Sequence, residues 1–249
     1  MSDTLYKLVI AYDGTSFSGW QIQPRGDSIQ GLLEKAFHTI TKEECRVIGS
    51  GRTDAGVHAL GQVAHVRLKQ KREPHKIKHS LNGLLPPAIR VRSIEEAPKS
   101  FHAQLSAKIK EYHYHICLDE VVLPFDRPYV WHLRKTLDIP LLKKAAAHFV
   151  GTHDFAAFAN APGKTSKKPS TTRTISRLDV IETPQGIRLE FEGNGFLYKM
   201  VRNITGMLVA VASGRRHIAD IHATLLSKDR KKAERAAPAQ GLFLVRVSY

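Results

Sequence analysis

The chain has 249 residues and a mass of 27.8 kDa, with 42% hydrophobic and 24% charged residues. This ordinary globular composition excludes a disordered chain, a collagen-like chain and a disulfide miniprotein. Lysine and arginine number 38 against 23 aspartate and glutamate, which gives a net charge of +15 and an isoelectric point near 9.9. A domain this basic usually meets a polyanion, so charge favours a nucleic-acid partner over a merely solvated basic surface.

No apolar run approaches the roughly 20 residues that a membrane span needs, so we expect no membrane partner. The first residues turn acidic and polar too early for a signal peptide. Cys45 and Cys117 are too few for a disulfide framework or a four-cysteine zinc site, and they fit a reducing compartment. We therefore predict a cytoplasmic protein.

The first part of the chain predicts six elements. The clearest is a helix over Ser28–Ile40, where Ser28 can cap the N-terminus and apolar residues recur at i, i+3 and i+4. A second helix over Pro74–Leu85 stops before two prolines. The segments that read as strands are Leu5–Tyr12, Cys45–Gly49, Gln62–Leu68 and Ile89–Ile94.

The second part repeats this order of elements. One helix covers Asp138–Val150, with Asp138 as its cap and Gly151 at its end. Longer apolar periodicity predicts a helix over Leu197–Ser213, and Ile218–Leu226 adds another. The predicted strands are Lys110–Leu118, Thr172–Glu182, Gly186–Gly193 and Leu242–Val247.

A repeated β-α-β-β-α-β order is typical of ferredoxin-like units. We predict an α+β protein of two such units, residues 1–105 and 106–249, whose sheets join into one continuous, mixed but mainly antiparallel sheet. Helices would cover one face, and a basic central cleft would hold an elongated partner. The segment Asn160–Arg173 is rich in Gly, Pro, Ser and Lys, and predicts a basic loop that either closes over a phosphate backbone or is a solvated insertion.

The glycine-rich segment Gly49–Ala59 is the strongest candidate for chemistry. Its glycines allow a sharp turn and a close approach by a ligand. Arg52 and Asp54 are two residues apart, so on extended backbone they project to one side. A carboxylate beside a guanidinium stays ionised, as a nucleophile must. The alternative is a connecting turn whose aspartate caps backbone amides.

Two further segments carry candidate residues. Alternation places Tyr112 and Tyr114 on one face of a strand and His113 on the other, so an aromatic face could stack on a base, or both tyrosines could be half-buried core. Arg202 lies beside the apolar stripe near the start of its helix, where a cation gains nothing from the helix dipole. It needs an anionic partner, or it is a solvated arginine on a polar face.

The remaining residues give no sign of a cofactor. The 13 histidines are not joined to cysteines at zinc spacing, so we expect no metal. Neither a phosphate-binding Walker loop nor a dinucleotide-binding glycine pattern after a strand occurs, and no serine stands in a nucleophile elbow. We therefore predict chemistry without a cofactor.

Several strings, in order along the whole chain, resemble those of the tRNA pseudouridine synthase A (TruA) family. The string GRTDAGVHA at Gly51–Ala59 looks like the family signature, and Tyr112 resembles its active-site tyrosine. The other matching strings are YDGTSFSGWQ at Tyr12–Gln21, SIQGLLEKA at Ser28–Ala36, FHA at Phe101–Ala103, GTHDFAAF at Gly151–Phe158, FLYKMVRNITG at Phe196–Gly206 and APAQGLFL at Ala237–Leu244.

The resemblance implies two ferredoxin-like units and a cofactor-free homodimer that acts on the anticodon arm of tRNA and not on DNA. Its reaction converts uridine to pseudouridine at positions 38, 39 and 40. The resemblance makes Asp54 the catalytic carboxylate, lets Tyr112 stack on the target uracil, and pairs Arg202 with Asp54. It also places Arg52, His58 and Leu242 among the substrate-binding residues.

This sequence departs from the family pattern at a few positions. Gln104 stands where arginine usually follows FHA, Glu111 stands before the tyrosine where basic residues are common, and Ala239 replaces a second proline. Two other classes of function fit the basic charge: a non-catalytic RNA-binding module, and an RNA nuclease or other enzyme of the glycosidic bond. An isolated carboxylate in an RNA groove repels phosphate, so the Arg52–Asp54 loop argues against the binding module.

Overall fold

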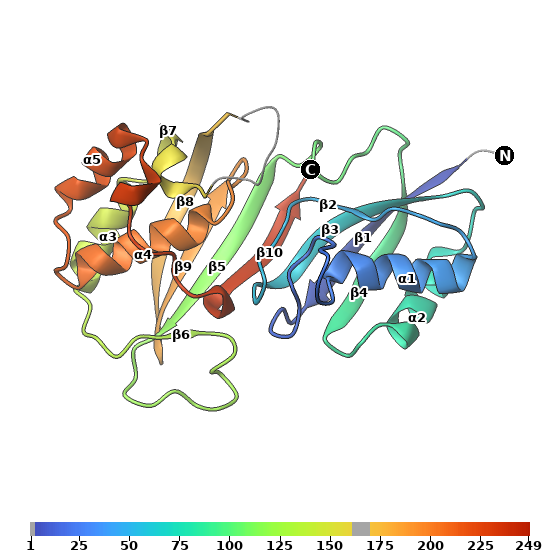
Figure 1. Ribbon diagram of the computed structural model, residues 1–249, viewed down its shortest axis with the longest axis horizontal. Helices are drawn as coiled ribbons and strands as arrows, with labels where there is room; N and C mark the ends of the chain where they lie inside the picture. The colour runs from blue at the N-terminus through green and yellow to red at the C-terminus, as the bar shows by residue number, and fades with distance from the viewer. Residues whose placement is uncertain (1–2, 161–169) are drawn as a thin grey trace. The chain divides into compact units, whose positions relative to one another are not determined.

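The computed structural model describes residues 3–160 and 170–249. It divides into two compact units (Figure 1). Unit 1 consists of Met1–Lys108 together with Phe243–Tyr249, and unit 2 of Ile109–Leu242. We had divided the chain into 1–105 and 106–249, so the C-terminal strand, expected in the second unit, groups with the first. Its pairing explains this, because Phe243 and Leu244 lie parallel to His58 and Ala59.

Unit 1 is built on a sheet with three long strands. The strand β1 lies between β3 and β4 and is antiparallel to both, while β2 and β10 both pair with β3. Figure 1 shows the two helices of this unit, α1 and α2, side by side. The elements are β1 (Thr4–Tyr12), α1 (Ile29–Thr41), β2 (Ile48–Gly49), β3 (His58–Leu68), α2 (Pro74–Leu84), β4 (Ile89–Ala97) and β10 (Leu242–Ser248).

The predicted helix α1 is confirmed together with its cap. The Ser28 side chain accepts a hydrogen bond from the Gly31 amide at 3.2 Å. Its apolar stripe is buried in the core of unit 1, where Leu33 and Phe37 are fully enclosed. The alternating residues of β1 supply the facing side of that core, with Leu8 and Ile10 at 0% exposure. The apolar side chains that recur with period 3.6 on the helix and with period 2 on the strand therefore pack together in one layer.

The four predicted strands of unit 1 have wrong bounds, since β1 begins one residue earlier, at Thr4, and β4 continues past Ile94 to Ala97. The first part of the predicted strand Cys45–Gly49 is not strand, because side chains of α1 satisfy its backbone: Glu34 accepts from the Val47 amide at 2.9 Å. The strand β3 begins at His58, earlier than the predicted Gln62. Its added residues pair with the end of β1 and with β10, and such long-range pairing leaves no trace in local periodicity.

Unit 2 has an antiparallel sheet in the order β5-β9-β8-β7, with the short β6 parallel to β5. Three short 3₁₀ helices, Ala156–Phe158, Arg230–Lys232 and Ala239–Gly241, join its elements. The elements are β5 (Ile109–Cys117), β6 (Trp131–His132), α3 (Ile139–Ala147), β7 (Gly151–Asp154), β8 (Thr172–Thr183), β9 (Gly186–Gly193), α4 (Met200–Ala212) and α5 (Ala219–Ser227).

Differences from the sequence prediction in unit 2 lie at helix ends and in two short strands that were not predicted. The helix α3 ends at Ala147, and Gly151 opens the strand β7 with a φ of +111° instead of closing the helix. The helix α4 starts at Met200 instead of Leu197, because Lys199 has a left-handed φ of +60°. The strands β6 and β7 are too short for alternation to reveal.

The predicted α+β class is confirmed, and each unit has a mainly antiparallel sheet. Unit 1 shows the predicted β-α-β-β-α-β order from β1 to β4, and β10 from the end of the chain is added to it. In unit 2 the same order is interrupted by β6, β7 and α5, and its last predicted strand, β10, groups with unit 1. Among the described residues, no helix combines the length and apolarity needed to cross a bilayer.

The cap of α1 gives a stability test. We expect Ser28→Ala to lower the free energy of unfolding by about 1 kcal/mol, because the Gly31 amide loses its acceptor at a buried helix end. Urea denaturation measures this. The exposed Thr39→Ala on the same helix is the matched control and should change stability far less. Equal losses in the two variants would show that the cap contributes nothing specific.

Candidate functional site

The Asp54 loop, residues 50–57, joins β2 to β3 in unit 1. It ends in a tight turn in which the Val57 amide donates to the Asp54 carbonyl at 3.1 Å. Gly56 takes a φ of +77° in this turn, a conformation that favours glycine. The loop reverses the chain directly after Asp54, so this carboxylate lies at a fixed corner of the backbone.

Thr53, the neighbour of Asp54, is held by two other segments. The Trp20 amide donates to the Thr53 carbonyl at 3.1 Å, and the Tyr12 hydroxyl lies 2.8 Å from Thr53 Oγ1. Burial raises the pKa of Tyr12 to about 12, so its phenol stays neutral and keeps this hydrogen bond at physiological pH. Thr53 itself is 7% exposed. The position of Asp54 is thus set by the end of β1 and by the segment that follows it.

The start of the loop is fixed by β3. The Ser50 amide donates to the Val63 carbonyl at 2.7 Å, and the Ser50 hydroxyl donates to Gln62 Oε1 at 2.7 Å. The amide nitrogen of Gln62 in turn donates to the Gly51 carbonyl at 2.9 Å. Both polar side chains are fully buried, so these bonds are not exchanged for water. The residues that precede Asp54 in the loop are therefore anchored at two separate points.

Glycines in the segment Tyr12–Gln21 allow it to lie against the loop. A Cβ on Gly14 would lie 2.0 Å from the Val57 carbonyl oxygen, and one on Gly19 would lie 2.5 Å from the Thr53 carbonyl oxygen. Gly19 also has a φ of +94°. These two close approaches flank Asp54 in sequence. They explain why the segment needs glycine at both positions.

His58 is placed differently from our expectation of a substrate contact. It is 1% exposed, and its ring stacks on Phe243 with centroids 4.6 Å apart. Its Nδ1 lies 3.0 Å from the Gly14 amide nitrogen and 3.2 Å from Asp13 Oδ1. With its ring enclosed in the core, His58 joins β10 and the Gly14 segment to the start of β3.

Both charged residues of the loop are accessible to solvent. Arg52 is exposed and Asp54 is half-buried, whereas Thr53 and Val57 are buried. A partly desolvated carboxylate on a rigid backbone can act as a nucleophile, as a general base, or as a stabiliser of developing positive charge. Its fixed orientation lowers the cost of aligning it with a reacting atom.

Tyr112 lies on β5 in unit 2 and is 7% exposed. Its ring meets that of Phe196 edge to face, with centroids 5.2 Å apart. Tyr114, two residues on, is fully buried and donates its hydroxyl to the Pro238 carbonyl at 2.7 Å. The predicted alternation is confirmed, and within it Tyr114 is a core residue. Phe196 belongs to the segment that leads into α4, so the structure brings Tyr112 and this segment together.

Arg202 differs from the rest of α4. Every other residue of this helix is buried, so the helix has no polar face on which a solvated arginine would be expected. Arg202 Nε donates to the Ala237 carbonyl at 2.8 Å, and the Ala237 amide donates back to the Arg202 carbonyl at 2.9 Å. A Cβ on Gly206 would lie 2.1 Å from the Arg235 carbonyl, so α4 lies directly against the chain that leads to Leu242. Leu242 is 6% exposed at the start of β10.

The segment Phe101–Ala103 is anchored in unit 1 by a neutral histidine. The Ala103 amide donates to His65 Nδ1 at 3.0 Å. Burial, with smaller effects from His102 and Arg67, lowers the pKa of His65 to about 4, so this acceptor stays unprotonated at neutral pH. Gln104, which departs from the family pattern, is exposed directly after this anchor.

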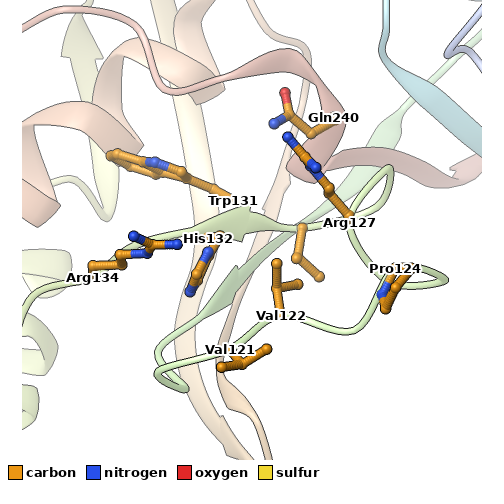
Figure 2. Close-up of a pocket in the computed structure, with 9 residues that line it drawn as sticks. Val121, Val122, Pro124, Arg127, Trp131, His132, Arg134 and Gln240 are labelled. Atoms are coloured by element: carbon orange, nitrogen blue, oxygen red, sulfur yellow. The ribbon is translucent and has the colours of Figure 1, made fainter.

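Unit 2 also contains a cavity of 660 Å³ (Figure 2). It is lined by residues of the segment 121–134, which leaves β5 and returns through β6, and by Gln240. Trp131, His132, Arg127 and Arg134 contribute the aromatic and cationic part of the lining. Sequence reasoning missed this site, because all of its residues except Gln240 lie outside the recognised strings and the segment 121–134 shows no periodic pattern.

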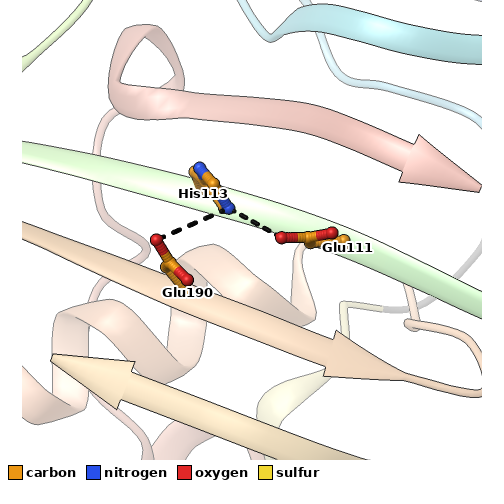
Figure 3. Close-up of side chains that lie close together, drawn as sticks. All are labelled: Glu111, His113 and Glu190. Carbon is orange, nitrogen blue, oxygen red and sulfur yellow. Dashed lines mark hydrogen bonds and ion pairs between the residues drawn. The ribbon is translucent and has the colours of Figure 1, made fainter. Parts of the chain in front are cut away.

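A second cluster joins Glu111, His113 and Glu190 on β5 and β9 (Figure 3). His113 Nε2 lies 3.0 Å from Glu111 Oε1 and 3.8 Å from Glu190 Oε1. Both carboxylates also meet guanidinium groups, since Arg177 contacts Glu190 at 2.7 Å and Glu111 at 3.3 Å. The acidic departure at Glu111 therefore belongs to an ion-pair network of the sheet.

Lys110, beside Glu111, is a candidate cation of a different kind. Burial, reinforced by the charge of Arg173, lowers the pKa of Lys110 to about 8. Arg173 ends the predicted basic loop Asn160–Arg173, of which residues 161–169 lie outside the described residues. A lysine whose charge is already destabilised by its surroundings gains more than an ordinary one from a phosphate neighbour.

Comparisons with known proteins support the sequence resemblance. A family model described as tRNA pseudouridine synthase matches residues 8–105 and 145–249. The protein named tRNA pseudouridine synthase A 1 from Protochlamydia amoebophila is 51% identical, and the match covers 98% of this chain and 96% of that protein. The protein named tRNA pseudouridine synthase A from Thermoanaerobacter sp. strain X514 is 43% identical, over 97% of this chain and 98% of that protein. The protein named tRNA pseudouridine synthase A from Oceanobacillus iheyensis is 41% identical, over 98% of this chain and 96% of that protein. Asp54 and Arg202 lie in the matched segments, whereas Tyr112 lies between them.

The close approach at Gly14 provides a test of the loop's support. We expect Gly14→Ala to lower the free energy of unfolding by roughly 1–3 kcal/mol, because the added methyl group would overlap the Val57 carbonyl. Gly83→Ala is the control, since a Cβ there meets nothing within 4 Å and a helical alanine should stabilise by about 0.5–1 kcal/mol. Urea titrations of both variants measure the difference. A Gly14→Ala protein as stable as wild type would refute the tight packing.

Proposed function

Because the chain belongs to the tRNA pseudouridine synthase family, it is an isomerase that forms pseudouridine in tRNA, and we propose that its targets are uridines 38, 39 and 40 of the anticodon arm. The observation that carries the catalytic assignment is the loop of Asp54, a half-buried carboxylate. The preceding residues Ser50 and Thr53 are held by buried hydrogen bonds, and the Asp54 carbonyl closes a turn with the Val57 amide. The net charge of +15 supports a polyanionic substrate.

The reaction needs only rearrangement within one nucleotide. The C1′–N1 bond breaks, the uracil turns, C5 bonds to C1′, and the proton on C5 leaves to solvent while N1 gains one. We propose that Asp54 is the carboxylate that makes this possible. It either traps the oxocarbenium-like sugar at C1′, as the nucleophile of a retaining glycosidase does, or removes the C2′ proton to start the cleavage. The balance of atoms requires no redox partner and no group donor.

The other roles follow the family resemblance. Tyr112 stacks on the target uracil, and its hydroxyl takes part in proton transfer. Arg202 accompanies the catalytic carboxylate as its cation, and its anchored place on an otherwise buried helix supports a role beyond solvation. Arg52, exposed on the loop, contacts the flipped nucleotide, and Leu242 gives an apolar contact to the base.

A uridine in a helical stem is out of reach of any side chain. We propose that the enzyme flips the target nucleotide out of the stack, at a cost of a few kcal/mol. Phosphate contacts from the basic surface offset this cost and make binding sensitive to salt. Recognition is mostly of the shape of the stem-loop, as is usual for RNA. We also propose that the enzyme acts as a homodimer in the cytoplasm, on the strength of the same resemblance.

The catalytic role of Asp54 can be tested directly. We expect Asp54→Asn to lower turnover by about 10³-fold or more, because a neutral amide neither attacks C1′ nor accepts the C2′ proton. Release of tritium from unmodified tRNA labelled at uridine C5 measures turnover. Asp27→Asn removes an exposed carboxylate of the same unit and should leave turnover unchanged. Asp54→Asn turnover near that of wild type would refute the assignment.

The product also separates the classes of function. Pseudouridine at positions 38–40 supports the proposal, and mapping it site by site in tRNA from cells with and without the protein identifies the targets. Strand breaks or abasic sites would indicate a nuclease or glycosidase instead. Tight binding of tRNA with no product would indicate a binding module.

Tyr112→Phe separates stacking from proton transfer. If the hydroxyl moves a proton, we expect kcat to fall by roughly 10²-fold or more with little change in KM, because the ring that stacks on uracil is retained. Single-turnover assays on unmodified tRNA give both constants. Tyr198→Phe, which removes an exposed hydroxyl of the same unit, is the control. An unchanged kcat would limit Tyr112 to stacking.

A further inference from the structure

The cavity of unit 2 combines groups that suit a nucleotide. Its volume of 660 Å³ lies in the range of small-molecule sites, which is about 300–1,000 Å³. Among the described residues, its lining consists of an indole, two guanidinium groups, an imidazole, an amide and four aliphatic side chains, without a carboxylate. Within the described residues, none of these groups forms a hydrogen bond, ion pair or ring contact with the Asp54 loop, Tyr112 or Arg202. The cavity is therefore considered as a separate binding site.

The aromatic wall is rigid. Trp131 is held on the edge of β5 by the pairing of β6 with Ile116 and Cys117. Its ring meets the fully buried ring of Tyr114 edge to face, with centroids 6.3 Å apart. His132 Nε2 donates to the Asp119 carbonyl at 2.9 Å, which leaves its Nδ1 as an acceptor. A fixed indole in a partly open site provides a stacking surface with little loss of side-chain entropy on binding.

The cations of the cavity are available to an anion. Within residues 3–160 and 170–249, neither Arg127 nor Arg134 forms an ion pair, and both are exposed. By contrast, Arg177 of the same unit is held by Glu190 and Asp179. The nearby carboxylate of Asp126 accepts from Gln185 and lies outside the lining. Figure 2 shows Arg127 and Arg134 on different sides of the cavity. Two separated guanidinium groups suit the two phosphates that flank one nucleotide.

We propose that this cavity binds a nucleotide of the RNA substrate other than the reacting uridine, with its base stacked on Trp131 and its flanking phosphates on Arg127 and Arg134. Gln240 then faces the base edge, where its amide can both donate and accept. The inference rests on the proposed function for the identity of the RNA. It gives the enzyme a second point of grip, which fixes the register of the stem-loop while the target nucleotide is flipped.

Fluorescence of Trp131 provides a readout that does not depend on activity. The chain has two tryptophans, and Trp20 is 3% exposed, so contact quenching by an oligonucleotide reports on Trp131. We expect a uridine trinucleotide to quench the wild-type protein, and to quench Trp131→Phe far less. Absence of quenching in the wild-type protein at saturating trinucleotide would overturn the proposal.

Affinity for an unmodified anticodon-arm RNA tests the cations. We expect Arg127→Ala/Arg134→Ala to weaken binding by about tenfold, to raise KM more than it lowers kcat, and to reduce the slope of log affinity against log salt by about 1.4, or about 0.7 for each phosphate contact. Lys135→Ala is the matched control for Arg134→Ala, because it removes the adjacent charge, which does not line the cavity. Equal effects of these two single variants would overturn the proposal.

Two other results would also decide the matter. The segment carries exposed Phe125, Val121 and Leu123, which could instead cover a second copy of this chain. If the double variant changes the molecular mass of the protein measured by sedimentation but leaves its RNA affinity unchanged, this surface binds another protein chain and the proposal fails. If wild type forms no pseudouridine but the trinucleotide quenches Trp131, the proposed reaction fails while the nucleotide site stands.

Discussion

The arrangement depends above all on the fixing of Thr53, the residue before the proposed catalytic carboxylate. Its carbonyl accepts from the Trp20 amide, and its hydroxyl meets the buried phenol of Tyr12. A free side chain on a glycine-rich loop would lose orientational entropy each time it met a substrate. Here that cost is met during folding, because the end of β1 and the segment after it hold the loop before any RNA binds.

The same logic extends to the polar groups under the loop. Ser50 and Gln62 are fully buried, and the Ser50 hydroxyl holds Gln62, which donates to the Gly51 carbonyl. His58 links the Gly14 amide to Phe243 by a hydrogen bond and a stacked ring. A buried network of this kind is stabilising only when every member has a partner. Loss of one of these hydrogen-bonding groups therefore disturbs the conformation of the Asp54 loop, even though none of them faces a substrate.

The arginines that contribute to the excess positive charge differ in what they bind, and therefore in their roles. On the sheet of unit 2, arginines such as Arg177 are held by carboxylates, so they contribute to the fold and little to a phosphate field. Arg202 is tied to the backbone of Ala237 inside an apolar helix packing. Arg127 and Arg134 belong to neither group. Net charge thus indicates the class of partner, whereas the pairing of each cation decides where that partner binds.

The sequence by itself determined the α+β class, the main helices with the cap at Ser28, and the family, because periodicity, capping and ordered strings are local properties. It also pointed to the Asp54 loop through its glycines. Only the tertiary structure decided what long-range contacts control. It assigned the Val47 backbone to Glu34 of α1, enclosed His58 in the core, and grouped β10 with the first unit through β3. It also revealed the cavity beside Trp131, because that site is assembled from a non-periodic segment and a distant glutamine that no local pattern joins.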